Sequence, residues 1–90
     1  GRLDDALSAF REYLSISQRL AAADASNAGW QRELAVAHSR VGQALQGMGH
    51  HEMAQPSFRS AVEPMERAVA MSPGNVGWHQ DLANLKSWLT

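Results

Sequence analysis

Apolar residues recur along the chain at steps of three and four, the spacing that places side chains on one face of an α-helix. One such stripe spans residues 54–69, and related stripes occupy residues 6–21, 30–48 and 78–89. The stripe at residues 54–69 consists of Ala54, Phe58, Ala61, Val62, Met65, Ala68 and Val69. No segment alternates with period two, so the pattern predicts helices and no strands.

Short polar turns between the stripes set the boundaries of the predicted helices. Asn27 and Asn75 each stand just before an apolar stripe, where an asparagine side chain is suited to N-cap a helix. Pro73 and Gly74 favour the end of the preceding helix, and glycines at 47 and 49 mark the remaining turn. We therefore expect helices at 2–23, 28–47, 51–71 and 76–89, with connections short enough to make consecutive helices antiparallel.

Two prolines interrupt the third predicted helix. Pro56 and Pro64 each lack a backbone donor, and a proline in a helix interior costs about 3 kcal/mol or more. Pro56 is tolerable if it lies in the first turn, whereas Pro64 lies too far along the chain for that. We therefore expect either a late start or a kink in this helix.

The chain contains an internal repeat. The segment NAGWQRELA at residues 27–35 returns as NVGWHQDLA at residues 75–83, a shift of 48 positions measured from Trp30 to Trp78. The same shift superimposes further identical pairs, including Phe10 on Phe58. Internal periods of this size are typical of repeat architectures.

One set of residues resembles the motif of the tetratricopeptide repeat (TPR), a helix-turn-helix unit. The set comprises Val41-Gly42, Leu45, Gly49, Ala54, Phe58, Ala61 and Pro73-Gly74-Asn75. His38 and His51 depart from the family, which usually has Trp and another aromatic residue there, and the family repeat is about 34 residues long rather than 48. Each helix of this repeat is about seven residues longer than in the ordinary TPR motif. Seven residues are close to two helical turns, so the apolar stripe of the longer helix still faces the core.

The resemblance is to the elongated repeats of multi-repeat bacterial proteins, and it implies the fold and its division. We expect an all-α chain in which antiparallel hairpins stack as a short TPR-like α-solenoid of about four helices. In this single domain, 1–24 is the second helix of a preceding repeat, 27–73 a complete repeat and 75–90 the first helix of a following repeat. Because Gly1 lies inside a helical pattern, we also expect a piece of a longer protein.

Composition narrows the possible partners. The chain has 90 residues, 44% of them hydrophobic and 19% charged, with a formal net charge of −1. It has no basic patch for nucleic acid and no apolar run near the ~18 residues that a membrane span needs, so we expect neither partner. The absence of cysteine excludes disulfides and fits a reducing compartment, from which we expect a cytoplasmic location.

The sequence carries no pattern of reactive residues. The histidines at 38, 50, 51 and 79 do not converge, since His38 lies ~15 Å or more along its helix from the turn at residues 47–50. The carboxylates are scattered beside the apolar stripes, and the glycine-rich run 42–49 has Met48 where a phosphate-binding loop needs Lys. We expect no enzyme, no cofactor and no metal; His38 and His51 are interpreted as packing or turn residues, and His79 as exposed and tolerant.

The resemblance implies a concave groove lined by the first helix of each repeat, which binds a protein or peptide. The corresponding positions here are Arg32, Val36, Ser39, Gln43, Gln46, Gln80, Asn84 and Ser87. A clamp of Lys and Asn, which some members use on a terminal carboxylate, is replaced by Ser39 and Gln43. The expected function is a non-catalytic protein–protein interaction scaffold; the alternative is a structural spacer or a self-association element that pairs through uncapped solenoid ends.

Three tryptophans and one glycine carry further expectations. Trp30 and Trp78 occupy equivalent points of the repeat and are expected to close the core between stacked units. Trp88 corresponds to Arg40 and is expected either to cover the end of the stack or to serve as an exposed anchor. Gly42 is expected to let two helices approach closely.

Overall fold

The computed structural model describes residues 1–89, and within them the fold is all-α. The helices are α1 (Arg2–Ala23), α2 (Ala28–Gly47), α3 (His51–Met71) and α4 (Val76–Ser87). No strand occurs in this part of the chain. The expected fold class and the number of helices are thereby confirmed.

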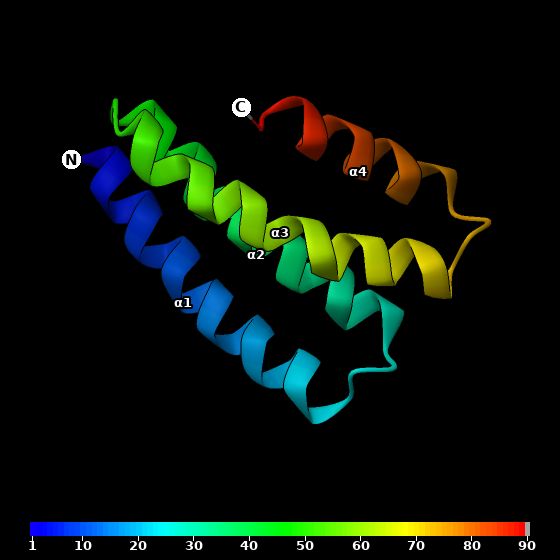
Figure 1. The fold of residues 1–90 in the computed structure, drawn as a ribbon. Helices are drawn as coiled ribbons and strands as arrows, with labels where there is room; N and C mark the ends of the chain where they lie inside the picture. Colours follow the sequence, from blue (N-terminus) through cyan, green and yellow to red (C-terminus); the bar gives the residue numbers. More distant parts are fainter. Residues whose placement is uncertain (90) are drawn as a thin grey trace.

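The helices α2 and α3 form the centre of the molecule, and α1 and α4 lie on opposite sides of them (Figure 1). Consecutive helices run antiparallel; α1 packs against α2, and α4 packs against α3. The core between them contains Leu7, Ala35, Val41, Ala44, Leu45, Ala54, Phe58, Ala61, Met65 and Leu85. Burial of these apolar faces is the main favourable term in the stability of such a bundle.

Predicted boundaries match the structure for α1, α2 and α3, whereas α4 is shorter than predicted. It ends at Ser87 instead of residue 89, and the Trp88 amide donates to the carbonyl groups of Leu85 and Lys86. Just past the end of the helix, the Trp88 ring packs on Phe58 at a centroid distance of 5.3 Å. The last residue of the predicted segment 75–90, Thr90, lies outside the described residues.

Both prolines lie inside α3. The helix begins at His51, so the expectation of a late start is wrong, and Pro56 lies in the second turn with an exposed side chain. Pro64 is buried and belongs to the buried face of the helix. Helical structure continues from His51 to Met71 through both residues, because the packed face of α3 offsets the lost backbone bonds.

The two copies of the Asn-x-Gly-Trp phrase cap α2 and α4 in the same way. The Asn27 side chain accepts a hydrogen bond from the Trp30 amide at 3.0 Å, and the Asn75 side chain accepts one from the Trp78 amide at 3.1 Å. Both predicted N-caps are confirmed. The glycine of the phrase leaves room for the cap, since a Cβ at Gly29 would lie 3.3 Å from the Asn27 Oδ1.

The residue after each tryptophan closes the preceding turn. Gln31 donates from Nε2 to the carbonyl oxygen of Ala25 at 3.2 Å, and the His79 Nε2 lies 2.7 Å from the carbonyl oxygen of Pro73. These are the same positions of the repeat, 48 residues apart. His79 is exposed as expected, and its ring is engaged in the turn; the expectation of a tolerant position stays a prediction.

Some apolar positions lie elsewhere than the periodic pattern placed them. Within the apolar stripe at residues 6–21, Leu7 is buried, whereas Leu20 is 38% exposed. Trp30 and Trp78 are half-buried and lie outside the buried core cluster, so they do not close the core. At both tryptophans, the repeated interaction is the hydrogen bond from the backbone amide to the asparagine that caps the helix.

Candidate binding groove

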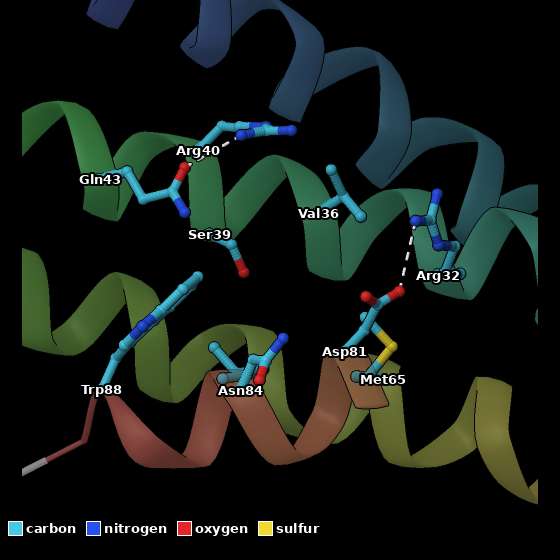
Figure 2. A pocket seen from close by; sticks show the side chains of 10 residues that line it. Arg32, Val36, Ser39, Arg40, Gln43, Met65, Asp81, Asn84 and Trp88 are labelled. Carbon is cyan, nitrogen blue, oxygen red and sulfur yellow. Dashed lines mark hydrogen bonds and ion pairs between the residues drawn. The ribbon is translucent and has the colours of Figure 1, made fainter. Parts of the chain in front are cut away.

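A hollow of about 250 Å³ lies between α2 and α4 and has α3 as its floor. It is lined by Arg32, Val36, Ser39, Arg40 and Gln43 of α2, by Met65 of α3, and by Asp81, Asn84, Leu85 and Trp88 of α4 and its C-terminal cap. Figure 2 shows α2 and α4 facing each other, with Arg32 reaching Asp81 across the hollow and Met65 beside Asp81. We call this hollow the groove.

One end of the groove is crossed by an ion pair between the two helices. The Arg32 Nη2 donates to the Asp81 Oδ2 at 3.3 Å (Figure 2). The Arg32 Nη1 lies 3.7 Å from the Glu33 Oε1. The side chains of Arg32 and Asp81 are 34% and 38% exposed, so solvent screens much of their attraction. The pair contributes to the position of α4 relative to α2 more than to stability.

Trp88 lies at the other end of the groove. Its ring meets Phe58 at an interplanar angle of 53°, the tilted arrangement that aromatic pairs favour. Its backbone carbonyl accepts a hydrogen bond from the Gln55 Nε2 at 3.0 Å, while the residue stays 37% exposed. Trp88 therefore packs on Phe58 and also lines the groove, while its expected role at the end of the stack or as an anchor stays a prediction.

Amide and hydroxyl groups occupy the middle of the groove. Gln43 accepts from the Arg40 Nη1 at 3.1 Å, and Asn84 accepts from the Gln80 Nε2 at 3.0 Å. Ser39 donates back to the carbonyl oxygen of Ala35 at 2.9 Å. Each hydrogen bond stays within one helix and leaves further donors or acceptors on the two amides for a bound segment.

The structure brings together five of the eight positions that the resemblance assigned to the groove. Arg32, Val36, Ser39, Gln43 and Asn84 line it. The other three, Gln46, Gln80 and Ser87, do not belong to its lining.

Each of the three missing residues has a local reason. Gln80 lies along its helix, bonded to Asn84, and the Ser87 hydroxyl donates to the Asn84 carbonyl at 2.6 Å. Gln46 is exposed in the last turn of α2.

Five groove residues were not assigned from the sequence: Arg40, Met65, Asp81, Leu85 and Trp88. The sequence could have indicated Arg40 and Trp88, because they are equivalent positions of the repeat and both line the groove. In the sequence, Met65 and Leu85 are recognisable only as apolar core positions. Nothing in the sequence shows that a hollow lies beside them, between α2 and α4. With two guanidinium groups and one carboxylate, the groove is also more charged than its assigned residues indicated.

Two titratable groups outside the groove lining have shifted pKa values. Burial, together with the hydrogen bond to Glu33 and the negative charge of that carboxylate, raises the pKa of Tyr13 to about 12. The Tyr13 hydroxyl thereby links α1 to α2. Burial lowers the pKa of His38, which is half-buried in α2, in line with its interpretation as a packing residue.

Among residues 1–89, no group of three or more His, Cys, Asp or Glu side chains is placed to hold a metal ion. His50 and His51 are exposed at the start of α3, and His79 is bonded to the turn before α4. In this described part of the chain, no helix is both long and apolar enough to cross a membrane.

Comparison of the chain with models of known protein families, with curated proteins and with solved structures finds no match.

Proposed function

We propose that this chain is a protein-interaction module of the elongated TPR type, and that the groove receives a segment of a protein partner. The observation that carries the proposal is the composition of the groove, which joins an apolar floor at Met65 and Leu85 to amides at Gln43 and Asn84. Such a surface can bury an apolar side chain of a bound segment and hydrogen-bond its backbone.

The size of the groove favours a protein segment over a cofactor. Its volume of about 250 Å³ is below the ~300–1,000 Å³ typical of small-molecule sites. Its charges are mixed, with Arg32 paired to Asp81, so they favour an extended or helical protein segment over nucleic acid.

The groove chemistry favours a non-catalytic role. The titratable side chains in its lining are Arg32, Arg40 and Asp81, and the aspartate is paired with Arg32. General acid–base or nucleophilic catalysis usually relies on a histidine, cysteine, serine–base pair or unpaired carboxylate, and the lining has only Ser39, which is bonded to its own helix, and the paired Asp81.

The TPR assignment is supported by the contact between two motif positions. A Cβ at Gly42 would lie 2.7 Å from the Phe58 Cε1, so the small residue of one helix receives the aromatic residue of the next. Gly49 adopts a φ of 83° at the turn between them, a conformation that favours glycine. Close helix approach and a tight turn are what a repeated helical hairpin requires.

The experiment that tests this function is photo-crosslinking from the groove. A photoreactive residue at position 43 is expected to capture a partner from the source cells, whereas the same residue at Gln18, on the exposed polar face of α1, is expected not to do so.

The captured partner, once purified, is then titrated with Gln43→Ala and Asn84→Ala variants. We expect about tenfold weaker binding for each, the equivalent of ~1.4 kcal/mol. Unchanged affinity in both variants would show that the groove is not the binding surface.

A second candidate function is self-association, the alternative to partner binding. It is favoured by the exposed apolar side chains Ile16 and Leu20, which lie on α1, away from the groove.

A further inference from the structure

The helix α1 carries apolar side chains on two faces, of which one is covered. Leu7 and Ala21 are buried, and Phe10 and Leu14 are partly buried against the core. The other face carries Ile16 and Leu20, which are 49% and 38% exposed. The internal repeat shows what kind of element fits this open face.

Under the 48-residue shift, α1 corresponds to α3 and α2 corresponds to α4. The pair α1–α2 therefore corresponds to the pair α3–α4, and the capped turns that join each pair have the same hydrogen bonds. However, α3 also packs against α2, and among residues 1–89 no helix takes the corresponding place on α1. The face of α1 without a partner is thus the counterpart of the face that α3 buries against α2.

Individual side chains agree with this correspondence. Ile16 corresponds to Pro64 and Leu20 to Ala68, and both residues of α3 are buried, Ala68 completely. The exposed apolar residues of α1 are therefore at positions that are buried where the neighbouring helix is present. Within the described residues nothing covers them, and they form part of the exposed apolar surface of α1.

The matching half of the contact lies on α4. Ala35 of α2 is completely buried, and its counterpart, Ala83 of α4, is exposed. The same chain thus presents both halves of an α2–α3 type interface, and Figure 1 shows α1 and α4 on opposite sides of the central pair.

We propose that the open face of α1, around Ile16 and Leu20, receives α4 of a second copy of this chain, through the face that contains Ala83. The contact continues the α2–α3 interface from one copy to the next. Because the two surfaces differ, the association is head-to-tail and does not close on itself at two copies. It uses a surface outside the groove and does not depend on partner binding.

Sedimentation velocity over a wide concentration range tests the proposal on the 90-residue chain. The average mass is expected to rise steadily with concentration, as open head-to-tail association requires. A chain that remains a monomer at the highest concentration would overturn the proposal.

Two variants that each block one face make the test specific. Ile16→Glu places a charge on the open face of α1, and Ala83→Glu places one on the open face of α4. Each is expected to weaken self-association by about tenfold or more. Gln18→Glu, an exposed position on the polar face of α1, adds the same charge and is expected to leave self-association unchanged.

Mixing the two blocked variants distinguishes head-to-tail contact from other pairings. The Ile16→Glu chain keeps an intact α4, and the Ala83→Glu chain keeps an intact α1, so an equimolar mixture is expected to form a complex of one copy of each. Persistent dimers of the Ala83→Glu variant alone would overturn the proposal in favour of an α1–α1 contact. Circular dichroism of each variant confirms that the helices are retained.

Discussion

Gly42 of α2 lies directly against the ring of Phe58 in α3. A Cβ at Gly42 would approach the Phe58 Cε1 to 2.7 Å and the Cδ1 to 2.9 Å, and Phe58 is completely buried. The two central helices can therefore pack at their observed separation only while residue 42 has no side chain.

Gly42→Ala is expected to lower the free energy of unfolding by about 1–2 kcal/mol. Overpacking a core costs ~1–3 kcal/mol, which exceeds the gain of about 1 kcal/mol for alanine over glycine in a helix. Gly47→Ala is the matched control, since its Cβ would lie 3.4 Å from the Leu3 Cδ2, an ordinary contact. Urea unfolding of both variants measures the difference; equal stability would contradict the packing argument.

Asn27→Ala is expected to lower the free energy of unfolding by about 1 kcal/mol, because the amide of Trp30 loses its side-chain acceptor. Asn75→Ala is expected to act in the same direction through Trp78. Thermal unfolding followed by circular dichroism gives both values. Gln18→Ala, exposed on α1, serves as the control, and a cap variant no less stable than this control would refute the capping role.

Tyr13 is expected to ionise with a pKa of about 12, which the ultraviolet absorbance of tyrosinate reports directly because the chain has one tyrosine. The folded pKa is above the ordinary value of 10.0, so the folded state holds the proton more tightly than the unfolded state. Stability is therefore expected to fall as the pH rises from 10.0 towards about 12. Glu33→Gln is expected to lower the midpoint; an unchanged midpoint would show that this carboxylate is not responsible.

Acidification below the ordinary histidine pKa of 6.5 is expected to lower stability through His38. Burial lowers the folded pKa of His38, so the unfolded state binds a proton first and the free energy of unfolding falls as the pH decreases through this range. His38→Gln is expected to reduce this slope, measured by urea unfolding between pH values above and below 6.5. His51→Gln, at an exposed position, provides the comparison.

The helix boundaries were predictable because their signals are local. The caps at Asn27 and Asn75 and the turn at Gly49 depend on residues a few positions apart, and the structure has them where the sequence places them. The end of α4 was predicted two residues too late, because the apolar period runs on to Leu89; past Ser87, Trp88 instead contacts Phe58, thirty positions away in the chain.

The groove was predictable only in part. Ser39, Gln43 and Asn84 follow from their positions in the repeat, because one face of each first helix is repeated with the sequence. Met65 could not be separated from the core, since its exposure to the groove depends on how far apart α2 and α4 lie.

By itself, the sequence determined the helices, their caps and their repetition, because period, capping and turn chemistry act over a few residues. Tertiary structure alone decided which apolar faces are buried. The stripes of α1 and α3 look alike in the sequence, yet Ala68 is buried and Leu20 is exposed, because α3 has helices on two sides and α1 has one.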